Sequence, residues 1–159
     1  PQSIRQALMQ DNNLIRCMAM DILRAKQVIL TGSGSSRYAA LVGRYLFSKL
    51  AGKFCEVVMA SEFEYFCESL DKSTLVIAIS QSGETADVIQ GVQKARKHGA
   101  TIFSMVNMKG STLDRMSDKV LYLNCGPEIS VAATKSFISQ LTLFYLLSFA
   151  MVNLLDEVV

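Results

Sequence analysis

The sequence predicts an α/β protein built as a three-layer α-β-α sandwich with a five-stranded parallel sheet. Short apolar, β-branched runs alternate with segments of helical spacing, and a polar turn follows several of these runs. Strands that alternate with helices are joined by right-handed crossovers, which make the sheet parallel and cover both of its faces. The chain has 159 residues, 50% hydrophobic and 19% charged, which suits one domain with a substantial core.

Five apolar runs supply the expected strands, at residues 28–31, 55–59, 75–79, 101–106 and 119–123. Apolar periodicity predicts helices at residues 4–9, 14–25, 37–50, 61–67 and 86–97, a helical turn from residues 110–113, and a long apolar helix from about residue 131. Either Asn12 or Asn13 is the expected N-cap of the second helix, and Ser61 is the expected N-cap of the helix over 61–67. Gly52 and Gly99 are expected to end the helices that they follow.

The most informative stretch is the turn Ser-Gln-Ser-Gly-Glu-Thr at residues 80–85, between a buried strand and an amphipathic helix. Such a turn directs backbone N–H groups and the positive end of a helix dipole at one point, which favours an anion there. The hydroxyls of Ser80, Ser82 and Thr85 can donate to it, and Gly83 lets the backbone bend and approach closely. Because the turn has no lysine, a single phosphate monoester is a better ligand than a nucleoside triphosphate.

An ordinary capped helix start is the alternative interpretation of this turn. Ser82 or Thr85 as an N-cap would explain one hydroxyl, but it would leave Ser80 and Gly83 without a role. Glu84 suits the helix dipole and would repel a phosphate, so its side chain is expected to point away from the ligand.

The turn Gly-Ser-Gly-Ser-Ser at residues 32–36 matches half of a dinucleotide-binding fingerprint. Arg37 stands in place of its third glycine, and Glu56 lies near the start of a strand rather than at its end, so no nucleotide cofactor is expected. The hydroxyls of Ser35 and Ser36 suit sugar hydroxyls or phosphate oxygens instead. A tight turn with a serine cap is the alternative.

A third turn, residues 126–135, brings small residues to the start of the long helix and leaves its first N–H groups accessible. Lys135 lies early in that helix, where the dipole disfavours a cation; either a ligand role or a salt bridge on a solvated face would explain it. All three turns follow strands, and ligands of parallel sheets bind at the carboxyl ends of strands near a change in strand order. We therefore expect the turns to converge.

The composition argues against several classes of function. The net charge is +2 and the basic residues are scattered, which disfavours nucleic acid as a partner. The chain has one histidine and four cysteines without C-x-x-C spacing, so we expect no metal site, and we expect buried free thiols in a cytoplasmic protein. No signal-peptide pattern begins the chain, and Pro1 in place of methionine suggests a segment of a longer protein.

Residues 136–155 imitate a membrane span, because they carry no charge over a length that can cross a bilayer. No cluster of Lys and Arg flanks them, however, and a helix that is apolar nearly all round is also found between two protein layers. We expect a core or interface helix and no membrane insertion. The stretch also contains six polar residues, Ser136, Ser139, Gln140, Thr142, Ser148 and Asn153.

Four sequence motifs are spread over nearly the whole chain. They are Gly-Ser-Ser at 34–36, Ala-Ser-Glu-Phe at 60–63, Ser-Gln-Ser-Gly-Glu-Thr-Ala-Asp at 80–87, and Gly-Pro-Glu-Ile at 126–129 through Thr-Lys at 134–135. In this order they resemble the sugar isomerase (SIS) domain family. Within it, the chain is most similar to the first of the two SIS domains of the glutamine–fructose-6-phosphate aminotransferases. The start of the chain, Pro-Gln-Ser-Ile-Arg, resembles the linker that leads into that domain.

The resemblance implies the five-stranded SIS fold, no cofactor, and a hexose 6-phosphate ligand, either fructose 6-phosphate or glucosamine 6-phosphate. In the family, one group of matching positions holds the phosphate and a second group, with a backbone segment, lines the sugar. The substrate-binding residues that this predicts are Ser35, Ser36, Ser80, Gln81, Ser82, Gly83, Thr85 and Val131. The family usually has serine where this chain has Ala133, so the sugar is less well defined than phosphosugar binding itself.

The aminotransferases that the chain resembles move ammonia from glutamine to fructose 6-phosphate and isomerise the product to glucosamine 6-phosphate. Their glutaminase half and their second SIS domain, with its glutamate base, lysine and histidine, have no counterpart in this sequence. Isomerisation needs a positioned base and a stabilised oxyanion. Glu62 and Glu128 are not assigned to that role, so no catalytic residue is predicted here.

Residues 1–26 are expected to form an N-terminal helical linker and packing segment, and residues 27–159 a single SIS domain. The first hypothesis is one half of a two-SIS enzyme, inactive or nearly so alone, that forms a homodimer or packs on a second SIS domain through residues 136–155. A non-catalytic sugar-phosphate sensor that regulates a partner is the second. The third is a stand-alone phosphosugar isomerase or deglycase that works as a homo-oligomer.

Overall fold

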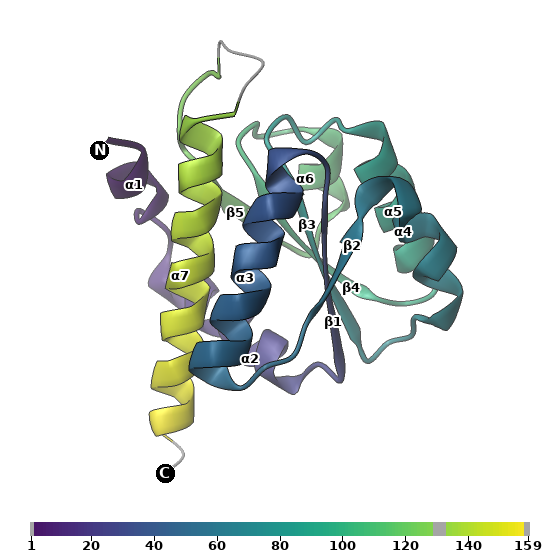
Figure 1. Cartoon of the computed structure of the whole chain (residues 1–159), viewed down its shortest axis with the longest axis horizontal. Helices are drawn as coiled ribbons and strands as arrows, with labels where there is room; N and C mark the ends of the chain where they lie inside the picture. The colour runs from purple at the N-terminus through teal and green to yellow at the C-terminus, as the bar shows by residue number, and fades with distance from the viewer. Residues whose placement is uncertain (1, 129–132, 158–159) are drawn as a thin grey trace.

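The computed structural model describes residues 2–128 and 133–157, and it confirms the three-layer α/β architecture (Figure 1). All strand pairs are parallel, and the sheet order is β2-β1-β3-β4-β5. The strands are β1 (Gln27–Gly32), β2 (Glu56–Met59), β3 (Thr74–Ser80), β4 (Thr101–Val106) and β5 (Lys119–Tyr122). Because β1 lies between β2 and β3, the strand order changes direction at the border of β1 and β3.

Helices cover both faces of the sheet (Figure 1). One face carries α1 (Gln2–Ala7), α2 (Asn12–Arg24), α3 (Ser35–Ala51) and α7 (Lys135–Asp156). The other carries α4 (Ala60–Phe66), the 3₁₀ turn η1 (Cys67–Ser69), α5 (Ala86–Lys97) and α6 (Thr112–Met116). The two layers bury separate apolar cores, one on each side of the sheet.

The central strand β3 shows why the sheet forms from this sequence. Leu75, Ile77 and Ile79 pack into the core beneath α3 and α7, while Val76 and Ala78 pack into the core beneath α4 and α5. All residues of β3 are buried, as expected for a parallel strand covered on both faces. A nearly continuous apolar run is therefore required here.

Two predicted helix N-caps are wrong. Neither Asn12 nor Asn13 caps α2; the N-cap is Asp11, whose carboxylate accepts a hydrogen bond from the Asn13 N–H at 2.8 Å. A charged acceptor is well suited to the positive end of a helix. Ser61 lies inside α4, because α4 follows β2 without a loop and its N-cap is Met59.

The predicted helix ends are better matched. Gly52 ends α3 in the left-handed conformation, with φ 63°, and Gly99, with φ 90°, follows α5. The bounds of α5 and β4 agree with the prediction. The long apolar helix begins at Lys135, not near residue 131, and residues 129–132 lie outside the described part of the chain.

Helix α7 packs against α1, α2 and α3 in this fold. By length and composition it is the kind of helix that can cross a membrane. Its inner side is buried, however, and the Phe144 ring lies edge-on to Phe47 of α3 with centroids 5.7 Å apart. Its outer side exposes Tyr145 and Phe149. The expected core or interface helix fits this packing.

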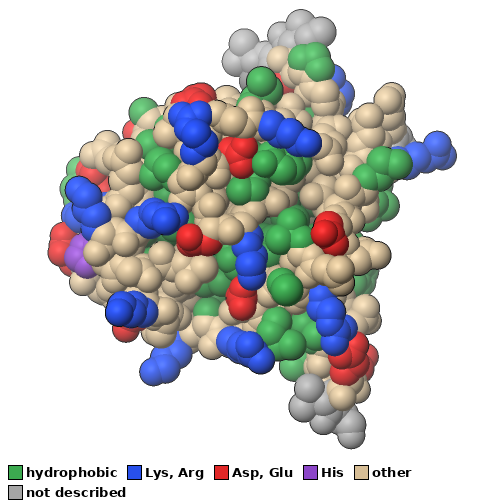
Figure 2. All heavy atoms as spheres, turned by 180° about the vertical axis from the view of Figure 1, so that it is seen from behind, with side chains coloured by type: hydrophobic (Ala, Val, Ile, Leu, Met, Phe, Trp, Pro, Cys, Tyr) green, Lys and Arg blue, Asp and Glu red, His purple; other side chains and the backbone are tan. Residues whose placement is uncertain are grey.

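The surface carries charges of both signs. On the face in Figure 2, Lys and Arg side chains are dispersed among acidic, polar and apolar groups rather than gathered into a stripe.

Gly43 tests the packing of α3 on α7, since a Cβ at this position would lie 2.4 Å from the Phe144 ring. Alanine favours a helix interior over glycine by about 1 kcal/mol. We nevertheless expect Gly43→Ala to lower the free energy of unfolding by about 1–3 kcal/mol, because the added methyl group overpacks the core. Urea denaturation measures the change.

The matched control for this substitution is Ser48→Ala, an exposed position on the same helix. Its free energy of unfolding should change by no more than about 0.5 kcal/mol. A Gly43→Ala protein as stable as the wild type would contradict the close contact.

Candidate functional site

Two of the three predicted turns meet at the carboxyl edge of the sheet. The β1–α3 turn and the β3–α5 loop flank the change in strand order, and Gly32 is the register partner of Ile79. A Cβ on Gly32 would lie 3.1 Å from both the Ile79 carbonyl oxygen and the Ser36 Cβ. Glycine therefore allows β1, β3 and the start of α3 to approach closely at this edge.

The β3–α5 loop is held by its own hydroxyls. Ser80 Oγ and Thr85 Oγ1 share a hydrogen bond at 2.8 Å, and the Gly83 N–H donates to Ser80 Oγ at 3.0 Å. The Glu84 N–H donates to Ser82 Oγ at 3.1 Å. Ser80 is buried, and Ser82 and Thr85 are partly exposed at the edge of the sheet.

Helix α5 begins without a side-chain cap. Thr85 is its N-cap residue, but its hydroxyl is paired with Ser80 and accepts no helix N–H among the described residues. Ser82 accepts from Glu84 within the loop, before the helix begins. The alternative of an ordinary capped start therefore does not describe this helix, whose N-cap residue makes no side-chain cap hydrogen bond among the described residues.

Glu84 and Gly83 fasten the loop to the start of α6. The Glu84 carboxylate accepts from the Thr112 N–H at 2.7 Å, and this hydrogen bond lowers the pKa of Glu84. As expected, the side chain is engaged away from the loop hydroxyls. Gly83 has φ 68°, and a Cβ there would lie 2.1 Å from Ser111 Oγ, so this position requires glycine.

Ser35 and Ser36 lie in the first turn of α3, which also lacks a side-chain cap hydrogen bond among the described residues. Ser36 is buried, and its hydroxyl accepts from the Gln140 amide of α7 at 2.9 Å. Gly34 precedes them with φ 54°. This turn thus places one buried and one partly exposed hydroxyl beside the β3–α5 loop.

Asn107 links the β3–α5 loop to the third turn, and the sequence analysis did not single it out. Its N–H donates to the Gln81 carbonyl at 3.0 Å, and its side-chain amide donates to the Gly126 carbonyl at 2.8 Å. Its side-chain oxygen accepts from the Cys125 N–H at 3.1 Å. An asparagine directly after β4, at the carboxyl edge of a parallel sheet, was the signal that could have found it.

The third turn is described only at its two ends. Val131 lies outside the described residues, so its predicted place beside the sugar is untested. Lys135 forms no salt bridge among the described residues, and its ammonium group donates to the Pro127 carbonyl at 2.8 Å. The ligand role weighed from the sequence stays a prediction.

Glu128 caps the start of α7, whose N-cap residue Thr134 makes no side-chain cap hydrogen bond among the described residues. Its carboxylate accepts from the Ser136 N–H at 3.0 Å, from the Ser136 hydroxyl at 2.7 Å and from the Thr134 hydroxyl at 3.0 Å. The hydrogen bonds from Ser136 lower the pKa of Glu128 to about 2. Its charge thus stabilises the start of α7.

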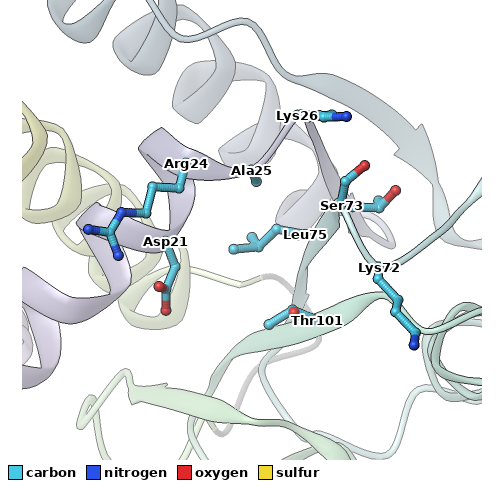
Figure 3. A pocket seen from close by; sticks show the side chains of 9 residues that line it. Asp21, Arg24, Ala25, Lys26, Lys72, Ser73, Leu75 and Thr101 are labelled. Atoms are coloured by element: carbon cyan, nitrogen blue, oxygen red, sulfur yellow. The ribbon is translucent and has the colours of Figure 1, made fainter.

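The opposite edge of the sheet has a hollow of about 370 Å³ (Figure 3). It lies at the amino ends of the strands, where the cationic ends of Arg24, Lys26 and Lys72 point away from one another (Figure 3). These cations therefore do not gather around one ligand. The hollow is lined by Asp21, Arg24, Ala25, Lys26, Lys72, Ser73, Thr74, Leu75 and Thr101.

The cysteines are free thiols, and three of them are buried as predicted. Cys17 departs from the prediction, because it lies on the exposed side of the amphipathic helix α2. Within residues 2–128 and 133–157, no group of His, Cys, Asp and Glu is placed to hold a metal ion.

Comparison with known proteins shows the family to which this chain belongs. The SIS domain model matches residues 21–150, and the chain therefore belongs to the SIS domain family. It is 44% identical to glutamine–fructose-6-phosphate aminotransferase (isomerizing) of Thermococcus kodakarensis over 156 residues, which are 98% of this chain and 26% of that protein. The same enzyme of Thermotoga maritima is 46% identical over 123 residues, covering 77% of this chain and 20% of that protein.

Comparison with a solved structure agrees with this family. The C-terminal domain of glucosamine-fructose-6-phosphate aminotransferase from Francisella tularensis superposes with a TM-score of 0.86 and 27% sequence identity, covering 98% of this chain and 45% of that chain. The chain thus spans about a quarter of the length of the first curated relative and less than half of this structure.

Glu128 gives a prediction for the pH dependence of stability. Folding lowers its pKa from 4.5 to about 2, so its stabilising effect is complete above pH 4.5 and is lost as the pH falls toward 2. At pH 7, Glu128→Gln should lower the free energy of unfolding by about 1 kcal/mol, the usual size of an N-cap effect.

Denaturation at a series of pH values tests this expectation. The difference in free energy of unfolding between wild type and Glu128→Gln should shrink as the pH falls from about 4.5 to about 2. Ser48→Ala, which removes no titratable group, supplies the control, and its difference from wild type should not change over this pH range. A Glu128→Gln gap that stays constant with pH would show that the carboxylate charge does not stabilise α7.

Proposed function

We propose that this chain binds a hexose 6-phosphate at the carboxyl edge of its sheet, as the first isomerase half of a glutamine–fructose-6-phosphate aminotransferase that makes glucosamine 6-phosphate. The β3–α5 loop carries this proposal, because the Ser80–Thr85 hydroxyl pair precedes a helix whose first N–H groups have no side-chain acceptor among the described residues. A phosphate monoester brings a charge near −2 and three acceptor oxygens, which match such donors. The names of the relatives support the substrate class.

The hydroxyls of the loop have hydrogens to spare for a ligand. The Ser80–Thr85 hydrogen bond uses one of two hydroxyl hydrogens, so the other can donate to a phosphate oxygen. Ser82 accepts from the Glu84 N–H, which leaves its own hydrogen available. In this proposal Ser80, Gln81, Ser82, Gly83 and Thr85 hold the phosphate, and Ser35, Ser36 and Val131 line the sugar.

The proposal assigns binding and orientation, not proton transfer, to this chain. Isomerisation between an aldose and a ketose needs a base whose pKa lies near the working pH. Glu128 is a poor candidate, because hydrogen bonds from Ser136 hold its pKa to about 2. Tight binding of the phosphate still assists a reaction elsewhere on the sugar, because this remote binding energy orients the reacting carbons. The base would come from a second SIS domain.

We also propose that the α1–α7 face packs against that second SIS domain or against a second copy of the chain. This face has an apolar groove of about 390 Å³, and Tyr145 and Phe149 on its rim are 44% and 55% exposed. A large exposed apolar patch of this kind is typical of an interface. The groove is lined by Ile4, Leu8, Ile138, Leu141, Thr142, Tyr145, Leu146 and Phe149.

Two further features stay proposals of the same kind. Residues 1–26 would serve as a helical linker and packing segment, which is supported by the contacts of α1 and α2 with α7. The location would be cytoplasmic, as suits an enzyme of sugar phosphate metabolism.

Calorimetric titration with fructose 6-phosphate and glucosamine 6-phosphate tests the binding proposal. The double substitution Ser82→Ala, Thr85→Ala should abolish measurable binding, because it removes two donors from the loop and frees Ser80 from its partner. The control is Ser69→Ala, an exposed hydroxyl of η1, which should leave affinity unchanged. Unchanged affinity in the double variant would reject the assignment of this loop.

Sedimentation velocity tests the proposed interface. We expect the chain to self-associate, or to bind an added second SIS domain, and Phe149→Lys should weaken that association at least tenfold by placing a charge in the apolar groove. Tyr65→Lys, an exposed aromatic position on α4, is the matched control and should have no effect. A wild-type chain that remains monomeric under both conditions would contradict the proposal.

A further inference from the structure

Gln140 is unusual among the buried polar side chains of α7. Ser136, Ser139 and Ser148 bond to the nearby Glu128 carboxylate, the Ser3 carbonyl and the Phe144 carbonyl. Ser139 also reaches another helix, through the Ser3 carbonyl of α1, whereas Gln140 donates from Nε2 to a side chain of another helix, Ser36 Oγ of α3, at 2.9 Å. Only 1% of its surface is exposed, and its Oε1 has no partner among the described residues.

We infer that Gln140 is a positioning residue of the sugar-phosphate site, acting through Ser36. A hydroxyl has one hydrogen to donate and two lone pairs to accept with. Because Gln140 Nε2 can only donate, its bond fills a lone pair of Ser36 Oγ and leaves the Ser36 hydrogen for a ligand oxygen. The same bond fixes the direction of the Ser36 hydroxyl at the start of α3 before any ligand arrives. This inference rests on the proposed function.

Stability alone does not explain an amide at this position. Burying a polar group that leaves an acceptor unpaired disfavours folding, and an apolar side chain of similar size would fill the same space without that penalty. The contact joins α7 to the first turn of α3 over 104 residues of sequence, and it ends on a hydroxyl at the carboxyl edge, where the connections after β1 and β3 lead to opposite faces of the sheet. The arrangement favours a role in the site over a role in the core.

Two substitutions separate the positioning role from a structural one. Gln140→Met removes both polar atoms at nearly constant length, so the thermal midpoint should stay within a few degrees of wild type while affinity for fructose 6-phosphate falls about threefold to tenfold. Gln140→Glu removes the amide donor; an ionised carboxylate only accepts, so Ser36 must turn its hydrogen toward it, and affinity at a pH where the carboxyl is ionised should fall at least tenfold. A structural role would lower stability and affinity together.

A double-mutant cycle with Ser36→Ala shows whether the effect passes through Ser36. In the Ser36→Ala protein, adding Gln140→Met should change affinity by less than about twofold, because the hydroxyl that Gln140 positions is already gone. The control is Ser148→Ala, a buried hydroxyl of the same helix that bonds within α7, and it should leave affinity unchanged. If Gln140→Glu does not fold, Gln140→Met and this cycle carry the test.

The outcomes distinguish the inference from the function on which it rests. Wild-type binding with unchanged affinity in folded Gln140→Met, or with a loss that persists in the Ser36→Ala background, would overturn the role of Gln140 and leave the proposed function standing. A wild-type chain that binds neither fructose 6-phosphate nor glucosamine 6-phosphate would reject the function and the inference together.

Discussion

The arrangement of this molecule depends on one constraint: a parallel sheet must be covered on both faces while its carboxyl ends stay in register. Crossovers on opposite faces send α3 to one side of the sheet and α5 to the other. Because β1 and β3 are neighbours, the first turns of these two helices still meet at one edge. Two helix N-termini therefore approach the same place from opposite layers, and the close contact at Gly32 makes that possible.

Hydrogen bonds within the protein hold the loops at this edge. Glu84 fastens the β3–α5 loop to the start of α6, and Asn107 fastens it to the segment after β5. With Thr85 paired to Ser80, the start of α5 remains without a side-chain cap among the described residues. Serine and threonine side chains often cap helices. In this loop they bond to one another and to the backbone instead, and the edge is rich in hydrogen-bond donors.

Much of the fold follows from local patterns in the sequence. The bounds of α5 and β4 were predictable because a strong apolar period ends at residues that break it. The cap of α2 was not, since Asp11, Asn12 and Asn13 are adjacent residues that all favour this role, and only the backbone path decides among them. That the turns follow strands was visible in the sequence, but the neighbouring positions of the first two depend on the strand order, which the structure supplies. The links made by Asn107 and Gln140 join distant segments, and no local pattern encodes such pairings.

The position of α7 in the chain has a consequence for synthesis. This helix, which covers one core together with α3, is contributed by residues 135–156, long after the strands that it covers. During translation α2 and α3 are made before α7, so the apolar residues on that side of β3 are only partly covered until α7 has left the ribosome. The nascent chain therefore exposes apolar surface that chaperones can bind, and the domain completes this core only after residues 135–156 have been made.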